Sequence, residues 1–372
     1  MNMQRRDFIK AGIATSALVL GASPFLTSCS TPCPRINPTD SPVPGLDKQQ
    51  AAMLHYASLA PSGHNTQPWT VSRSEKTGFT IGFDPKRTLP AVDPDNRELL
   101  LSIGTFIENL CLTAGNAGFD PEVTILSQVP TDPTVARIRL HPASPQNYPL
   151  KRLEMRRTVK SGMQSRDIKK SDVDKLSQPF DGRLFYFPTG TRHADCIAEG
   201  AIEAFRTQTW RADAQAELSR WIRFGNEECA RHLDGITTAG METGPLASWY
   251  INTFMSAEDV LSKTFREKGI DKTAAQAREG GGWFIITSTG ETVADIVDTG
   301  RRFQRMSLLA REHKLAIHPM TQQLEEKKFR EQIARAHETG MIPQFILRVG
   351  YLNRYPDPVS PRRPVNRFLV ES

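Results

Sequence analysis

The spacing of hydrophobic and polar residues predicts alternating helices and strands from residue 47 onward. Apolar residues at helical spacing indicate helices, and period-two alternation indicates strands. In chain order these are a helix over 47–59, strands over 69–73 and 79–83, a helix over 96–119, and strands over 122–126 and 135–140. A stretch containing three prolines, residues 141–149, then predicts a break between this first unit and the rest of the chain.

A second series of helices and strands follows the break. In chain order these are a strand over 183–188, helices over 194–208, 212–224 and 257–268, a strand over 282–288, helices over 292–313 and 325–335, and a strand over 343–351. The stretch 235–253 is expected to be irregular and lid-like, and 315–322 is expected to be a loop. Because both units contain a long central helix between strands, we expect an α+β fold with a mixed sheet flanked by helices in each half.

The first 28 residues have the pattern of an export signal. Arg5 and Arg6 precede an apolar run that is too short for a bilayer span of about 20 residues, and this pair resembles a twin-arginine (Tat) signal. The sequence "LTSC", which ends at Cys29, resembles a lipobox and predicts lipidation of Cys29. An ordinary signal peptide or a buried helix is the alternative. Residues 29–45 are rich in proline and predict a tether, so we expect a lipoprotein anchored to the membrane in the periplasm or cell envelope.

Composition narrows the class of protein only slightly. The 372 residues are 38% hydrophobic and 24% charged, with a net charge of +6, which is typical of a soluble globular protein. Basic residues are interspersed with acidic ones, so we expect no nucleic-acid partner. The five cysteines form no CxxC pair and the eight histidines form no HExxH motif, so we expect no bound metal.

The most unusual stretch is "APSGHNTQPW", residues 60–69, between a predicted helix and a predicted strand. One interpretation is structural, in which Asn65 and Gln67 bind neighbouring backbone groups while Trp69 fills the core. The other is a ligand site, because amide side chains both donate to and accept from the edge of a planar heterocycle such as a flavin. The residues alone leave both open. His64 lies in the same loop, where we expect a packing or hydrogen-bonding role.

Three segments resemble motifs of the nitroreductase superfamily, whose members are FMN-dependent oxidoreductases with an α+β fold and a flavin at the dimer interface. "APSGHNTQPW" is similar to that family's S-P-S-x-x-N-x-Q-P-W loop. "RRTVK", residues 156–160, resembles its R-x-[ST]-x-[RK] motif, and "SPRRPVNRFL", residues 360–369, resembles its basic C-terminal segment. The basic motif here follows the loop, whereas it precedes the loop in single-domain members.

This reversed order implies a fusion of two units within one chain. It resembles the two-domain Acg-like branch, in which the fused units form an intrachain pseudo-dimer with one FMN site. We therefore expect an N-terminal nitroreductase-like half over 46–145 and a C-terminal half over 146–372. The complete protein would be a monomeric pseudo-dimer or a homodimer.

The resemblance also implies which residues bind FMN. The basic motif would contact the phosphate, the ribityl chain and the flavin N1/O2 edge, the loop would cover the ring, and the C-terminal arginines would complete the phosphate clamp. These residues are Arg156, Arg157, Thr158, Lys160, Pro61, Ser62, Gly63, Asn65, Gln67, Arg362 and Arg363. The segment 249–254 is expected to cover the flavin.

The expected function is two-electron reduction of an electrophilic small molecule, such as a nitroaromatic or a quinone, by an unidentified small-molecule donor. The flavin itself would carry the chemistry. A protein that stores FMN without turnover is the alternative, and a cofactor-free scaffold is a third hypothesis.

Overall fold

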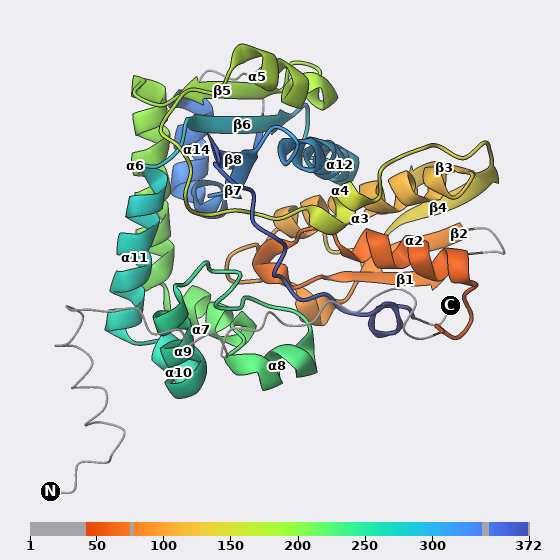
Figure 1. The fold of residues 1–372 in the computed structure, drawn as a ribbon, viewed down its shortest axis with the longest axis horizontal. Coiled ribbons are helices and arrows are strands. Elements are labelled where there is room, and N and C mark those ends of the chain that lie inside the picture. Colours follow the sequence, from red (N-terminus) through yellow and green to blue (C-terminus); the bar gives the residue numbers. More distant parts are fainter. Residues whose placement is uncertain (1–41, 75–77, 337–341, 371–372) are drawn as a thin grey trace, which may run out of the picture. The chain divides into compact units, whose positions relative to one another are not determined.

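Two four-stranded antiparallel sheets with the same strand order form the frame of the molecule (Figure 1). The computed structural model describes residues 42–74, 78–336 and 342–370, which belong to one compact unit. The first sheet has the order β1-β2-β4-β3, with β1 (Trp69–Arg73), β2 (Gly78–Phe83), β3 (Phe119–Ile125) and β4 (Thr134–Pro142). The second has the order β5-β6-β8-β7, with β5 (Leu184–Pro188), β6 (Gly282–Ser288), β7 (Leu315–Pro319) and β8 (Ile342–Tyr351).

A long helix occupies the same place in each unit. Helix α3 (Arg97–Asn116) connects β2 to β3, and α12 (Val293–Ala310) connects β6 to β7. The repeated strand order and the matching helices confirm the predicted α+β class and make an intrachain pseudo-dimer plausible. The predicted boundary near residue 146 stays a prediction.

Helices α3 and α12 pack directly on each other and join the two units. A Cβ atom on Gly104 would lie 2.2 Å from the carbonyl oxygen of Val297, and one on Gly300 would lie 2.2 Å from the carbonyl oxygen of Leu101. Only glycine permits this approach at either position. Although α3 is long and apolar enough to span a membrane, most of it is buried inside the protein, as expected of a core helix.

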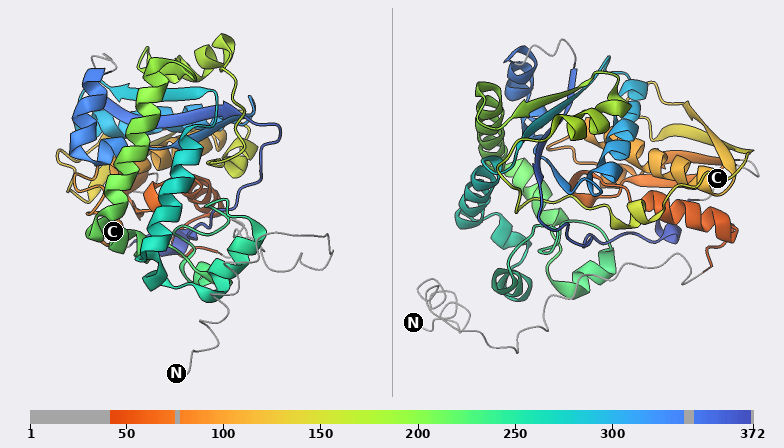
Figure 2. Two further views of the ribbon diagram at one scale, coloured as in Figure 1. Left: turned by 90° about the vertical axis from the view of Figure 1, so that its left-hand side faces the viewer. Right: turned by 45° about the horizontal axis from the view of Figure 1, so that its top comes forward.

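Among the other helices, α2 packs on α3 of the first unit, whereas α6, α13 and α14 pack on the second sheet (Figures 1 and 2). Helix α6 packs against β5 and β6, and α11 packs on α6. These helices are α2 (Lys48–Ser58), α4 (Lys151–Met155), α5 (Lys170–Ser177), α6 (Arg192–Trp210), α7 (Ala212–Trp221), α8 (Gly225–His232), α9 (Pro245–Phe254), α10 (Ala257–Val260), α11 (Lys263–Ala277), α13 (Gln322–Glu325) and α14 (Lys327–Ala336).

Side-chain caps fix the starts of helices in both units. The Asp47 carboxylate accepts from the backbone N–H of Gln50 at 2.8 Å, which completes a capping box at the start of α2. Thr292 and Asp295 form the same box at the start of α12. These polar pairs satisfy backbone donors that the first helical turn leaves without partners.

The C-terminal segment returns to the first sheet and runs beside β1 (Figure 1). The backbone N–H of Val71 donates to the carbonyl oxygen of Phe368 at 2.8 Å, and the N–H of Val370 donates to the carbonyl oxygen of Val71 at 2.8 Å. This isolated bridge between Val71 and Leu369 is parallel, whereas all the strand pairs of both sheets are antiparallel. Among the described residues the expected mixed pairing is therefore absent from the two sheets, and parallel pairing is found in this bridge and in a second isolated bridge between Ile222 and Ile236.

Three local predictions differ from the structure. The expected loop 315–322 contains β7 and the start of α13, and the expected irregular segment 235–253 contains most of α9. The helix expected over 257–268 is two helices, α10 and α11, with a break at Ser262, whose hydroxyl caps α11.

Candidate active site

The loop between α2 and β1 has an unusual backbone. His64, Asn65 and Gln67 have φ angles of 46°, 54° and 49°, in the left-handed region that residues other than glycine seldom adopt. Each such residue costs on the order of 1–3 kcal/mol, and such strain clusters at functional sites. Contacts from elsewhere in the chain must therefore hold this loop in place.

The two amide side chains of the loop provide those contacts. Asn65 Nδ2 donates to the carbonyl oxygen of Gly235 at 3.0 Å, and Gln67 Nε2 donates to that of Leu233 at 2.9 Å. Asn65 Oδ1 accepts from Arg362 at 2.7 Å. The structural interpretation of the loop is thus correct in part, but the partners of its amides lie 166 or more positions away along the chain. Trp69 is fully buried and stacks on Phe106, with ring centroids 5.0 Å apart.

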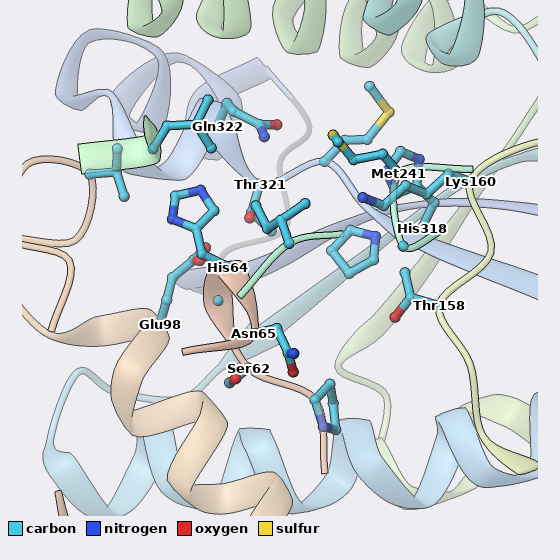
Figure 3. A pocket seen from close by; sticks show the side chains of 18 of the residues that line it. Ser62, His64, Asn65, Glu98, Thr158, Lys160, Met241, His318, Thr321 and Gln322 are labelled. Carbon is cyan, nitrogen blue, oxygen red and sulfur yellow. The ribbon is translucent and has the colours of Figure 1, made fainter. Parts of the chain in front are cut away.

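The same loop forms one wall of a cavity of about 460 Å³, which is large enough for a cofactor or small substrate (Figure 3). Apolar side chains, among them those of Leu101, Phe303 and Phe345, line part of it. The residues predicted to bind FMN that line the cavity are Pro61, Ser62, Gly63, Asn65, Arg156, Arg157, Thr158, Lys160 and Arg362. The structure therefore brings nine of the eleven predicted residues, from both units, to one space.

One side of the cavity carries basic and donor groups (Figure 3). Arg156 is buried, and its Nη1 donates weakly to the Thr158 hydroxyl at 3.4 Å. The ammonium nitrogen of Lys160 has no hydrogen-bond partner among the described residues. Burial lowers the pKa of Lys160, and the nearby Glu242 opposes this effect. Arg156, Thr158 and Lys160 can therefore present donors to a bound anion or carbonyl oxygen.

Arg157 is already engaged within the protein. Its Nη2 lies 3.0 Å from Glu242, and its Nη1 donates to the carbonyl oxygen of Asp357 at 2.6 Å. The Glu242 carboxylate also accepts from the backbone N–H of Lys160 at 3.1 Å and from the Ser161 hydroxyl at 2.7 Å. Glu242 thus fixes the shape of the basic segment, and Arg157 serves mainly to hold that segment in place.

The C-terminal arginines hold the loop in place. Arg362 lines the cavity, yet its guanidinium donates to Asn65 at 2.7 Å and to the carbonyl oxygen of Leu59 at 3.3 Å. Gln67 and Arg363 are not among the described residues that line the cavity. Arg363 donates to Gln67 through its backbone N–H at 2.8 Å and through Nη1 at 2.7 Å. This geometry does not support the expected phosphate contact of Arg363, because its donors face protein carbonyls, and burial lowers the pKa of Arg363 to about 10.

The opposite side of the cavity is acidic. Glu98 lies beside His64 at this side (Figure 3), and Glu325 accepts from Gln208 at 2.5 Å and from Thr321 at 3.2 Å. Burial, reinforced by the charge of Glu98, raises the pKa of Glu325 well above its ordinary value. Burial lowers the pKa of His64 to about 4, and its Nδ1 is buried without a hydrogen-bond partner among the described residues. The cavity therefore has distinct basic and acidic sides.

Several residues that shape the cavity carry no signal in the sequence. The acidic pair comes from α3 and α13, and His318 comes from β7, none of which carries a recognisable motif. The expected cover, residues 249–254, contributes none of the described lining residues. Residues 235–241 provide that wall instead, and Trp249 on α9 is 42% exposed. Among the described residues, no cluster of three or more metal-ligating side chains is present.

Comparisons with known proteins agree with the motifs. No family model matches the chain. It is 23% identical over 349 residues to the probable NAD(P)H nitroreductase PigM of Serratia sp. (strain ATCC 39006), covering 85% of this chain and 92% of that protein. It is 25% identical over 327 residues to the putative NAD(P)H nitroreductase Rv3131 of Mycobacterium tuberculosis (strain H37Rv), covering 85% and 90%.

The names of these relatives support a relationship between this chain and the nitroreductase superfamily. The chain is also similar to Rv3127 of the same M. tuberculosis strain, an uncharacterized protein, with 24% identity over 333 residues and coverage of 84% and 90%. Among solved structures, the FMN-dependent nitroreductase NfnB of Mycobacterium smegmatis in complex with NADPH overlaps 56% of this chain and 92% of its own, at 14% identity and a TM-score of 0.34. That overlap is weak. The similarity to the nitroreductase-like relatives, in contrast, extends over nearly their whole length.

Proposed function

We propose that this protein is an FMN-dependent oxidoreductase of the nitroreductase type, which reduces an electrophilic small molecule such as a nitroaromatic or a quinone by two electrons. The observation that supports this function best is that the loop 61–65 lines the same cavity as Arg156, Thr158 and Lys160. Figure 3 shows Ser62 and Asn65 to one side of Thr158 and Lys160. The two segments belong to different units of the fold, as the motif order implies for a fused pair. The proposal also agrees with the two relatives named as NAD(P)H nitroreductases.

The cavity residues fit the chemistry of FMN. The dianionic phosphate needs cationic donors, and Arg156 and Lys160 are the residues that would hold its anionic and carbonyl oxygens. The flat ring system needs apolar surface, which Leu101, Phe303 and Phe345 supply. When bound, FMN supplies the two-electron transfer itself.

The role of the protein is then to bind, orient and shield. The loop residues Ser62, Gly63 and Asn65 form a fixed wall, since the Asn65 side chain is held by Gly235 and Arg362 of the second unit and the Ser62 hydroxyl accepts from the backbone N–H of Gln67. Lys160 would stabilise negative charge on a bound ligand, because its ammonium group lines the cavity. NAD(P)H is the first donor to test, given the names of the relatives.

Flavin binding is the decisive test. We expect the purified full-length protein to be yellow, or to become so with added FMN, and to release FMN on denaturation. Anaerobic reduction by NADH or NADPH, followed by reoxidation with a nitroaromatic or a quinone, would establish turnover. A flavin that only dithionite reduces and that no such acceptor reoxidises would favour the storage alternative. Colourless protein that ignores FMN would exclude both.

The Arg156→Gln variant tests the assignment of the site. Loss of a charge-assisted hydrogen bond of about 1.5–3 kcal/mol should weaken FMN binding by about 10- to 150-fold in a fluorescence titration. Arg206→Gln is the matched control, because Arg206 is exposed on α6 and pairs only with Glu203 among the described residues. Equal FMN affinity in the two variants would contradict the placement of the ligand against Arg156.

We further propose Tat-dependent export and a lipid anchor on Cys29. Both rest on residues 1–41, which lie outside the described part of the structure. The support for them is the sequence pattern alone. Cell fractionation of the native protein tests them, since recovery in the cytoplasm without lipid would contradict both.

A further inference from the structure

His318 lies on the basic side of the cavity, outside the loop 60–69, the basic segment 156–160 and the C-terminal segment 360–369 (Figure 3). It belongs to β7, where the antiparallel register places it directly opposite Arg348 of β8. Residues paired in this way have side chains on the same face of the sheet. The imidazole and the guanidinium therefore meet, and His318 Nδ1 lies 3.2 Å from Arg348 Nη2.

The identity of Arg348 fixes the tautomer of this histidine. A guanidinium can only donate hydrogen bonds, so Nδ1 of His318 must be the acceptor. In a neutral imidazole the single ring proton must then be on Nε2. Arg348 itself cannot turn away easily, because it is fully buried and also donates to the backbone carbonyl oxygens of Lys160 and Gln276.

The Nε2–H group is directed at the cavity. His318 is only 8% exposed, and it is among the residues that line the cavity. Its Nε2 has no hydrogen-bond partner among the described residues. It is nevertheless not one of the fully buried polar atoms without a partner, so some of its surface is accessible. The remaining exposed surface of this side chain therefore faces the ligand space, next to Lys160.

We propose that His318 is a binding residue of this site, which donates an Nε2–H hydrogen bond to a carbonyl oxygen or ring nitrogen of the bound flavin. This inference rests on the proposed function. Together with the Lys160 ammonium, His318 gives the ligand a second, directional donor on the basic side. None of the three sequence motifs contains this residue.

His318 stays neutral because of its surroundings. Burial lowers the pKa of His318 well below its ordinary value, and the neighbouring cations Arg348, Lys160 and Lys272 act in the same direction. Glu279, which lies 3.4 Å from Arg348, faces the guanidinium rather than the imidazole. The Nε2–H donor should thus be present throughout the range from about pH 5 to pH 8 in which an ordinary histidine titrates.

Binding measurements on three variants test this assignment. His318→Leu removes the donor and should weaken FMN binding about tenfold in a fluorescence titration, while His318→Gln, which keeps an amide donor, should recover most of the affinity. His193→Leu is the control, because His193 is exposed on α6. Thermal melting of each variant separates a folding defect from a binding defect. Equal FMN affinity in folded His318→Leu and in the wild type would overturn the proposal.

A second measurement does not depend on FMN. Nitrogen-15 NMR of the imidazole side chains should show His318 with an unprotonated Nδ1 and a protonated Nε2, without titration between about pH 5 and pH 8. A protonated Nδ1, or a titrating ring, would overturn the inference even if FMN binds. If the NMR result holds but the wild-type protein does not bind FMN, the proposed function is wrong and flavin is not the acceptor. The assignment of His318 Nε2–H as a hydrogen-bond donor would still stand.

Discussion

The crossing of α3 and α12 predicts that Gly300→Ala destabilises the protein. The new Cβ would lie 2.2 Å from the carbonyl oxygen of Leu101, whereas ordinary van der Waals contact begins at 3.4 Å. The obstacle is backbone, so no side chain can rotate away, and the helices must move apart by about 1.2 Å. Overpacking of this kind costs about 1–3 kcal/mol. This cost outweighs the gain of up to about 1 kcal/mol in helix propensity when alanine replaces glycine, so the net effect is destabilising.

Gly269→Ala provides the matched control for this prediction. Gly269 also lies inside a helix, α11, but the nearest atoms to its added Cβ are 3.8 and 3.9 Å away, in the ring of Phe205. This substitution should therefore stabilise the protein by about 0.5–1 kcal/mol through helix propensity alone. Both substitutions replace a helical glycine by alanine, and they differ in local packing. Opposite changes in the free energy of unfolding would therefore isolate the effect of the helix crossing.

Urea unfolding followed by circular dichroism measures both effects as free energies of unfolding. We expect the order Gly269→Ala, wild type, Gly300→Ala from most to least stable. In the double variant of Gly104 and Gly300 the second substitution should cost less than the first, because the helices have already separated. A Gly300→Ala protein at least as stable as the wild type would refute this reasoning.

Two further predictions concern buried carboxylates. The buried Asp234 carboxylate lies 2.6 Å from the guanidinium of Arg223 and 2.8 Å from that of Arg87. Asp234→Asn should therefore lower the free energy of unfolding in urea by about 3–5 kcal/mol. A decrease below about 1 kcal/mol would contradict this prediction. Burial raises the pKa of Asp93 from 3.8 to about 6. Between these two pH values the folded protein therefore binds more protons than the unfolded chain. Through Asp93, the free energy of unfolding thus falls as the pH rises. In unfolding measured from about pH 4 to pH 7, Asp93→Asn should remove about 2 kcal/mol of this pH dependence, and an unchanged slope would contradict the assignment.

The sequence predicted well the elements whose signals are local. Strand β1 and strand β6 begin and end where their apolar patterns do, and α2 begins at the capping box of Asp47. Strand β7 was missed because its five residues, which end in Pro319, have no clear alternation. Its extended state follows from pairing with β8, which lies beyond α14 in the chain. Helix α9 was missed because Gly244 and Pro245, which indicate a loop, also mark a helix start.

The site shows the same division between local and distant information. Motif resemblance identified the loop and the basic segment, since both are continuous in sequence. It could not indicate which of their side chains face a ligand. Arg363 and Gln67 turn toward each other, and His318 acquires its role only through its register opposite Arg348. Such facts depend on pairings between strands and segments that are far apart in the chain.

The strain in the loop links the formation of the site to the docking of the two units. Three left-handed residues in four positions are unfavourable locally, and the side-chain amides of Asn65 and Gln67 are held by groups from the second unit. The cavity wall therefore forms only when the units meet, and that meeting depends on the glycine crossing of α3 and α12. A substitution that separates these helices, such as Gly300→Ala, should consequently increase hydrogen exchange of the loop amides before the protein unfolds globally.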